Sequence, residues 1–174
     1  MKLLIVYATE EGHTRKICRF LRDEAVDQGH RVELVNANDE PPQPAEFDKV
    51  VIASPIHIGK FHREARDFIH QYDLQLNLLP TAFVTVSLTA SDKTDSKGMK
   101  ELQRITEKFL AETAWRPNRV EHVAGALSFS KYGWVTAFIM QSIAKKHGEL
   151  VDRDCDVEET DWEQVKRFAS EFFV

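Results

Sequence analysis

Residues 9–14, Thr-Glu-Glu-Gly-His-Thr, place two hydroxyls and a glycine between an apolar run at residues 3–7 and a helical pattern that starts at Arg15. A turn that joins a strand to a helix can bind phosphate. Its N–H groups converge at the positive end of the helix, and hydroxyls add donors. Gly12 permits a positive φ angle or close approach of a ligand. The candidate phosphate-binding residues are Thr9, Glu10, Glu11, Gly12, His13 and Thr14.

The same turn limits the class of ligand. It lacks the Gly-Lys-Ser or Gly-Lys-Thr ending of a nucleotide P-loop, and the chain contains no Gly-x-Gly-x-x-Gly. Nucleoside triphosphates and dinucleotides are therefore less favoured than a mononucleotide with one terminal phosphate. The order Thr-x-x-Gly-x-Thr after Ile-Val-Tyr resembles the FMN-phosphate loop of flavodoxins. Taken alone, the turn also fits a strand-turn-helix without a ligand, but its place at the start of the chain favours FMN.

Length and charge bound the type of protein. With 174 residues, 43% of them hydrophobic, the chain can bury one substantial core, so we expect a single domain over residues 1–174. Its 23 basic and 28 acidic residues give a formal charge of −5 without a basic tail, which argues against nucleic-acid binding. Cys18 and Cys155 lack metal-ligand spacing, and Cys18 is expected to be a small core residue. The absence of a secretory-signal pattern predicts a cytoplasmic location.

Strand-like and helix-like segments alternate along the chain. The strand-like runs, several of them continuously apolar as in parallel strands covered on both faces, are residues 3–7, 31–35, 50–53, 82–88 and 120–127. Helical stripes are formed by Ile17, Leu21 and Ala25; Phe61, Ala65, Phe68 and Tyr72; Leu102, Ile105 and Phe109; and Trp162, Val165, Phe168, Ala169 and Phe172. Thr160 and Glu163 form a capping-box pattern before the last helix. The pattern predicts a doubly wound α/β fold with a five-stranded parallel sheet.

Ligands of such sheets bind at the carboxyl ends of strands, where two further polar loops are expected beside the turn of residues 9–14. In the flavodoxin pattern these two loops hold the isoalloxazine ring, with backbone amides facing its pyrimidine edge. Each loop alone also fits an ordinary connection; their position at one edge favours a flavin site. Neither carries a Trp or Tyr, so one face of the ring is expected to be open to a substrate. The candidate residues are Ser54, Pro55, Ile56, His57, Ile58 and Gly59, and Ser87, Leu88, Thr89 and Ala90.

Histidine spacing does not predict a metal site. His57 and His62 are five residues apart across a loop–helix junction, so joint ligation of a metal ion is not expected.

An apolar insertion follows the fifth predicted strand, over about residues 128–150. It contains too few apolar residues to span a bilayer, because a membrane-spanning helix needs about 20 of them. One interpretation is a buried extra helix. The other is an element that contacts a partner or a membrane surface, with Lys145 and Lys146 placed for anionic headgroups.

Several phrases together resemble the flavodoxin-type, quinone-dependent protoporphyrinogen IX dehydrogenase family of bacteria. They are residues 7–14, residues 53–62, Trp115-Arg116-Pro117, Ala124-Gly125-Ala126-Leu127 with the aromatic-rich insertion, and Thr160-Asp161-Trp162-Glu163. The resemblance covers essentially the whole chain. Two features depart from it: Cys18 stands where flavodoxin signatures often have Ala, and residues 92–95 mix acids with bases.

The resemblance implies an FMN enzyme of haem biosynthesis that removes six electrons from protoporphyrinogen IX in three two-electron cycles. The flavin would carry the redox chemistry, so no catalytic side chain is assigned. The acceptor would be a membrane quinone, menaquinone or ubiquinone, and peripheral contact with the cytoplasmic face of the inner membrane is expected. Candidates for contacts with substrate propionates or the quinone are Lys60, Arg63, Lys93, Lys131, Trp134 and Phe138. The basic side chains among them are also typical of a solvated surface.

Two alternatives use the same fold. A soluble flavodoxin would carry electrons between proteins and have no substrate of its own. An NAD(P)H:quinone oxidoreductase would reduce quinone with a nicotinamide. The loops without ring-stacking Trp or Tyr and the apolar insertion argue against the carrier, and an assay with NADPH and quinone separates the other two activities.

Overall fold

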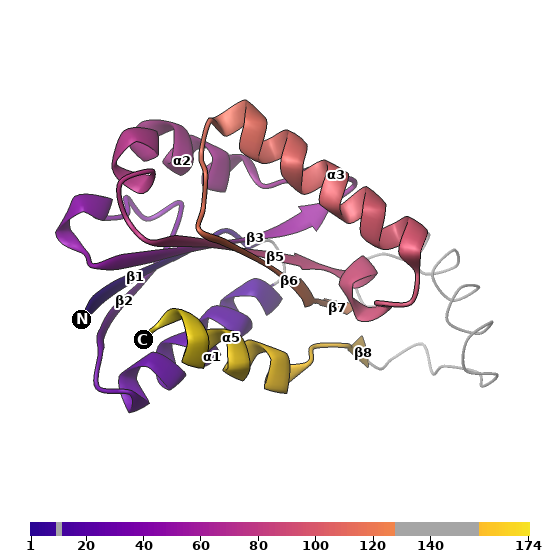
Figure 1. The fold of residues 1–174 in the computed structure, drawn as a ribbon, viewed down its shortest axis with the longest axis horizontal. Helices are drawn as coiled ribbons and strands as arrows, with labels where there is room; N and C mark the ends of the chain where they lie inside the picture. The colour runs from indigo at the N-terminus through magenta and orange to yellow at the C-terminus, as the bar shows by residue number, and fades with distance from the viewer. Residues whose placement is uncertain (10–11, 128–156) are drawn as a thin grey trace.

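The computed structural model describes residues 1–9, 12–127 and 157–174. Its central sheet contains five parallel strands in the order β2-β1-β3-β5-β6 (Figure 1). From β1 the chain places β2 on one side and β3, β5 and β6 on the other, which confirms the predicted doubly wound sheet. The strands are β1 (Lys2–Tyr7), β2 (Arg31–Asn36), β3 (Lys49–His57), β5 (Thr81–Ser87) and β6 (Arg119–Ala124).

Helices cover both faces of this sheet (Figure 1). One layer holds α1 (His13–Asp27) and α5 (Trp162–Phe172), and the other holds α2 (Arg63–Leu76) and α3 (Ser96–Thr113). Short 3₁₀ turns, η1 (Pro44–Glu46) and η2 (Leu88–Ser91), lie in the connections. Alternate residues of β1 face the two layers, with Leu3 and Ile5 in the α1/α5 core and Leu4 and Val6 in the α2/α3 core. Burial on both faces explains why β1 is continuously apolar.

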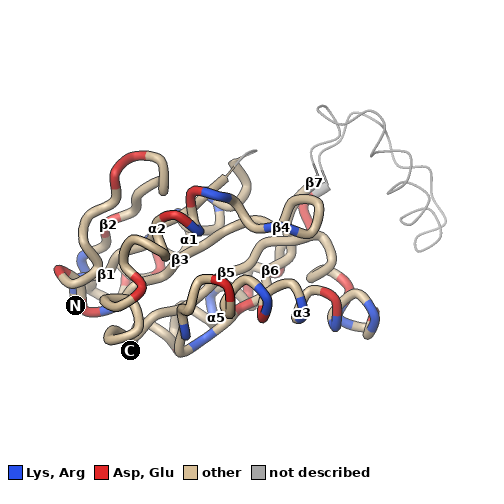
Figure 2. The backbone as a smooth tube through the Cα atoms, turned by 90° about the horizontal axis from the view of Figure 1, so that it is seen from above, with Lys and Arg blue, Asp and Glu red and all other residues tan. Residues whose placement is uncertain are grey.

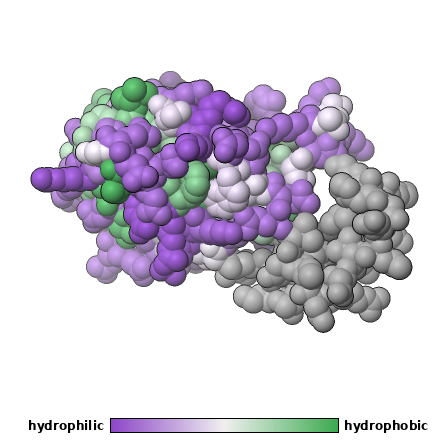
Figure 3. All heavy atoms as spheres, turned by 90° about the horizontal axis from the view of Figure 1, so that it is seen from below, coloured by the Kyte–Doolittle hydropathy of each residue, from purple (hydrophilic) through white to green (hydrophobic). Residues whose placement is uncertain are grey.

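The predicted apolar stripe of α1 is confirmed. Ile17, Leu21 and Ala25 are fully buried, and Cys18 lies among them. Burial also raises the pKa of the Cys18 thiol, which keeps it protonated. Viewed from the α1/α5 side, the surface of the described residues is mainly hydrophilic (Figure 3). These helices therefore turn their apolar faces toward the sheet.

The helix predicted to begin at Phe61 begins at Arg63. Phe61 belongs to β4 (Lys60–Phe61), which forms an antiparallel hairpin with the end of β3. Its ring is still buried, with its centroid 4.9 Å from that of Phe83 and 4.7 Å from that of Phe109. The helical spacing was misleading because a buried residue just before a helix can continue its apolar stripe.

The strand predicted over residues 120–127 is divided at Gly125. β6 ends at Ala124, and β7 (Ala126–Leu127) pairs antiparallel with β8 (Val157–Glu158). A Cβ atom at Gly125 would lie 3.3 Å from Val86 Cγ1, so glycine permits a close approach to β5 where the chain leaves the sheet. The predicted insertion of about residues 128–150 lies outside the described residues. The chain on either side of residues 128–156 is joined in the β7–β8 ribbon.

Asp161, rather than Thr160, caps helix α5. The Asp161 carboxylate accepts a hydrogen bond from the Gln164 N–H at 3.0 Å. The Thr160 hydroxyl instead donates to the Ala124 carbonyl at 2.8 Å. The capping-box pattern therefore located the start of the helix to within one residue but assigned the cap to the wrong side chain.

Candidate functional site

The three loops predicted to bind a ligand follow neighbouring strands. β3 lies between β1 and β5 and runs parallel to both, so the carboxyl ends of all three strands lie at one edge of the sheet. The turn after β1, the hairpin after β3 and η2 after β5 are therefore brought to this edge. The winding of the chain also reverses here, between β1 and β3, which is where such sheets bind ligands. Glu10 and Glu11 of the turn lie outside the described residues.

The turn after β1 presents backbone donors. Gly12 has a φ of 91°, and no atom lies within 4 Å of the Cβ that a larger residue would add there. Its N–H donates to the Thr9 hydroxyl at 2.9 Å. The first helical bond runs from the Lys16 N–H to the Gly12 carbonyl, so the N–H groups of residues 13–15 have no acceptor within α1. Thr14 is buried at the start of this helix. This arrangement fits a phosphate group.

His13 connects the turn to the segment after the insertion. Its Nε2 lies 2.7 Å from the Thr160 hydroxyl oxygen, whose own hydrogen is donated to the Ala124 carbonyl. A hydroxyl has one hydrogen to donate, so His13 Nε2 must carry the proton of this contact. Burial lowers the pKa of His13, although the charge of Glu158 opposes this effect. A neutral ring protonated on Nε2 leaves Nδ1 as an acceptor.

A second contact holds β8 against α1. Lys16 Nζ lies 2.5 Å from the Glu158 carboxylate, and Trp162 Nε1 donates to the other oxygen of that carboxylate at 2.8 Å. The Lys16 ammonium also lies 5.3 Å from the centroid of the Trp162 ring. The hydrogen bond from Lys16 is the main reason that the pKa of Glu158 is lowered. Together with His13–Thr160, this contact attaches the base of the β7–β8 ribbon to the helix that begins at the phosphate turn.

The hairpin after β3 has a two-residue turn with positive φ at both positions, 48° at Ile58 and 71° at Gly59. This is the backbone of the type I′ turn that favours Asn-Gly. A β-branched residue in the left-handed region is strained, and the Ile58 side chain is also 86% exposed. The Ser54 hydroxyl anchors the hairpin by accepting the His62 N–H at 3.2 Å. Ile56 packs against the core on the α2/α3 side.

An unsatisfied hydroxyl lies at the end of β5. The Ser87 Oγ is buried and has no hydrogen-bond partner among the described residues. The Ser87 carbonyl is occupied, because it accepts the Gly125 N–H at 3.0 Å. In η2, Ala90 is buried against Leu102 and Ala124. A buried hydroxyl without a partner at a predicted ligand edge fits a site completed by a bound molecule.

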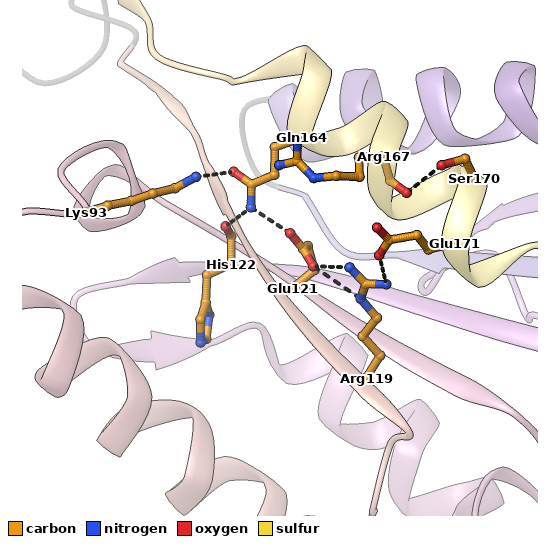
Figure 4. A network of polar contacts seen from close by, with 8 residues as sticks. All are labelled: Lys93, Arg119, Glu121, His122, Gln164, Arg167, Ser170 and Glu171. Carbon is orange, nitrogen blue, oxygen red and sulfur yellow. Dashed lines mark hydrogen bonds and ion pairs between the residues drawn. The ribbon is translucent and has the colours of Figure 1, made fainter.

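A polar network ties the loop after η2 to helix α5 (Figure 4). Lys93 Nζ donates to Gln164 Oε1 at 3.1 Å and lies 4.0 Å from the Asp161 carboxylate. Gln164 Nε2 donates to the Glu121 carboxylate at 2.6 Å and to the His122 carbonyl at 3.0 Å. Lys93, a predicted substrate contact, thus holds its own loop against α5, and Gln164 in turn holds α5 against β6. The network continues from Glu121 through Arg119 to Glu171.

Comparison with known proteins decides the family. A flavodoxin-domain family model matches residues 4–154. A protoporphyrinogen IX dehydrogenase (quinone) of Escherichia coli K12 is 36% identical over 172 residues, which cover 98% of this chain and 94% of the relative. The chain belongs to the flavodoxin-type protoporphyrinogen IX dehydrogenase family. A Leishmania major protein of the same name is 32% identical over 173 residues, covering 98% of this chain and 74% of that one.

Solved flavodoxins share the fold of this family member. Flavodoxin 1 of Bacillus cereus superposes with a TM-score of 0.57 at 15% identity, covering 99% of this chain and 97% of that one. Flavodoxin 2 of the same organism gives a TM-score of 0.56 at 20% identity, with the same coverage of both chains. At these identities the likeness establishes the architecture.

The other residues predicted to contact substrate or quinone do not form one cluster among the described residues. Lys60 is exposed on β4, and Arg63 pairs with Asp67 on the exposed side of α2 at 3.1 Å. Lys131, Trp134 and Phe138 lie outside the described residues. Sequence reasoning missed the contacts of Thr160 and Glu158, because partners 147 and 142 residues away leave no local pattern.

Proposed function

We propose that this protein binds FMN and oxidises protoporphyrinogen IX to protoporphyrin IX, with a quinone as the electron acceptor. The 36% identity to a protoporphyrinogen IX dehydrogenase (quinone) over 98% of the chain carries this proposal. The reaction removes six electrons and six protons in three two-electron steps, and each step reduces one quinone to a quinol.

The proposed position of FMN follows from unsatisfied groups at one edge. The phosphate would accept hydrogen bonds from the free N–H groups at the start of α1 and from the Thr14 hydroxyl. The ring would lie between the β3–β4 hairpin and η2, where the Ser87 hydroxyl lacks a partner. Bound FMN would accept two electrons at a time, and the protein would contribute its position and its electrostatic surroundings.

Reconstitution and turnover test this proposal. Flavin released from the purified protein should be FMN. The FMN-loaded protein should then form fluorescent porphyrin from protoporphyrinogen IX under anaerobic conditions, only when a quinone is present. Three quinones should be reduced for each porphyrin formed. No rate above the non-enzymatic background would contradict the proposal and favour the electron carrier.

The nicotinamide alternative is tested in the same samples. An NAD(P)H:quinone oxidoreductase would consume NADPH when quinone is added, without any porphyrinogen. We expect NADPH oxidation to stay at the background rate, because the relatives that match 98% of this chain are protoporphyrinogen IX dehydrogenases.

We also propose that the quinone is reached at a membrane surface, through the apolar insertion of residues 128–150. Within the described ranges, no helix combines the length and apolar character needed to cross a bilayer. The insertion has too few apolar residues to span a bilayer, which takes about 20, so a peripheral contact suits a lipid-soluble acceptor. Turnover with menaquinone and with ubiquinone analogues identifies the acceptor.

A further inference from the structure

A cavity of about 260 Å³ lies between α2, α3 and the β3–β4 hairpin, on the α2/α3 side of the sheet. Its apolar part is formed by Phe61, Ile105 and Phe109. The hairpin closes one end, where the Cβ that a larger residue would add at Gly59 would lie 4.0 Å from Ile105 Cδ1. The cavity thus adjoins the hairpin that is proposed to hold the flavin ring, and it opens on a different helical layer from the phosphate turn.

The lining of this cavity is strongly basic. Lys60, Arg66, Arg104 and Lys108 surround it, and among the described residues Glu112 is the one acidic residue in its wall. The basic positions on α3 and at β4 are visible in Figure 2. The whole chain has a formal charge of −5, so this local excess of positive charge contrasts with the negative net charge of the protein. Four cations around one small cavity repel one another unless an anion lies among them.

The acidic side chains nearby do not neutralise the cavity. Glu112 is shared, because its two carboxylate oxygens lie 3.8 Å from Arg66 and 3.8 Å from Lys108. Arg104 pairs at 2.6 Å with Glu101, which is not part of the lining. Lys60 forms no ion pair with a carboxylate of the described part of the chain.

Arg66 supplies the most specific feature. Its Nε is buried and has no hydrogen-bond partner among the described residues, while its guanidinium lies 5.7 Å from the centroid of the Phe109 ring. A buried guanidinium donor without an acceptor is unfavourable. The planar fork of arginine matches the two oxygens of a carboxylate. The Arg66 side chain is 38% exposed, so the cavity combines an aromatic wall with an accessible guanidinium that can donate hydrogen bonds to a carboxylate.

We propose that this cavity binds a carboxylate group of a mainly apolar ligand. Resting on the proposed function, this group is a propionate of the porphyrin substrate. At about 260 Å³ the cavity is below the range of about 300–1,000 Å³ typical of whole-ligand sites, so it holds a side chain. The macrocycle stays outside, beside the hairpin. Arg66, Arg104, Lys60 and Lys108 then fix the orientation of the substrate, and the FMN phosphate has no part in this contact.

Binding of protoporphyrin IX and of its dimethyl ester tests the proposal, because esterification removes both carboxylate charges. Both probes are titrated into FMN-loaded protein in the same detergent and followed by porphyrin fluorescence. We expect wild-type protein to prefer the diacid at least tenfold and Arg66→Gln to reduce that preference at least fivefold. Arg22→Gln removes the same charge on α1, across the sheet, and should keep the wild-type preference.

Equal preference in wild type and folded Arg66→Gln would overturn the proposal, as would a wild-type protein without preference. If Arg66→Gln does not fold, the exposed pair Arg104→Gln and Lys108→Gln gives the same test. In turnover, Arg66→Gln should raise the KM for protoporphyrinogen IX at least fivefold and leave the KM for quinone unchanged. Binding is measured without turnover. An Arg66-dependent preference in a protein that oxidises no porphyrinogen would therefore refute the proposed function and retain the carboxylate site.

Discussion

The Nε2 atom of His13 lies 2.7 Å from the hydroxyl oxygen of Thr160, across 147 residues of sequence. His13 begins the helix that follows the phosphate turn. Thr160 follows β8, which pairs with β7 and so joins the chain on either side of residues 128–156. The hydroxyl passes its own hydrogen to the Ala124 carbonyl at the end of β6. One hydroxyl therefore connects the proposed phosphate site, the sheet and the base of the insertion.

Thr160→Val should lower the free energy of unfolding by about 1 kcal/mol or more, because it leaves the His13 Nε2 and the Ala124 carbonyl without their partner. Urea denaturation of the FMN-free protein measures the change. Thr160→Ser keeps the hydroxyl and is the matched control. Equal loss in both variants would mean that the hydrogen bond contributes nothing.

Stability should fall as the pH is lowered from 7 to 5. Burial lowers the pKa values of His13 and His122 in the folded protein, so the unfolded chain binds protons at a higher pH than the folded chain does. The stabilisation is complete above the unfolded histidine pKa of about 6.5 and is lost as the pH falls toward the lowered folded values. Urea midpoints at pH 7, 6 and 5 measure the slope.

His13→Gln is the matched variant for this pH dependence. Its amide can still donate to the Thr160 hydroxyl, but it does not titrate. The loss of stability between pH 7 and pH 5 should therefore be smaller than in the wild-type protein. An unchanged slope would show that His13 does not contribute to it.

Converting Thr9 and Thr14 together to Ala should weaken FMN binding at least tenfold. Hydroxyl donors to a charged group contribute about 1.5–3 kcal/mol each, and the Thr9 oxygen also holds the Gly12 N–H. Flavin fluorescence titration measures the affinity, with circular dichroism to confirm folding. Unchanged affinity in the folded double variant would refute the position of the phosphate.

Ile58→Asn should stabilise the FMN-free protein by about 1 kcal/mol. A β-branched residue at a φ of 48° is strained, whereas Asn accepts the left-handed conformation. The exposed Ile58 side chain gives up little burial when it is replaced. Ile58→Val keeps the branching and should leave the thermal midpoint unchanged. If the two variants have the same midpoint, the turn is not strained.

Replacing Trp134 and Phe138 with Ser should weaken binding to phospholipid vesicles or raise the KM for a long-tailed quinone, with FMN content unchanged. Their segment holds more apolar residues than one helix face on this sheet would bury, and exposed apolar patches usually mark a contact. If the double variant unfolds without a separable effect on membrane or quinone, the insertion is part of the core.

Local sequence patterns determined most of the architecture. Strand-like runs, several of them continuously apolar, located the five strands, and spaced apolar residues located the helices. Burial on two faces gives a continuous apolar run, and burial on one face gives a periodic one. The same reasoning brought the turn at residues 9–14 and the loops at residues 54–60 and 87–93 to one edge. For Gly12 it allowed a positive φ angle or a close approach of a ligand, and the structure shows a φ of 91° there.

Only the tertiary structure decided which distant side chains meet. Phe61 kept the spacing of a helix but lies in a hairpin, and Thr160 kept the spacing of a cap but bonds to Ala124 and His13. Lys93 is a candidate substrate contact by its type and place, and only the packing of α5 shows that it also donates a hydrogen bond to Gln164. The cavity around Arg66 is lined by residues of the β3–β4 hairpin, α2 and α3, so it forms only when these three elements pack together. Such contacts depend on how separate elements pack, and packing across the chain leaves no periodic pattern in the residues themselves.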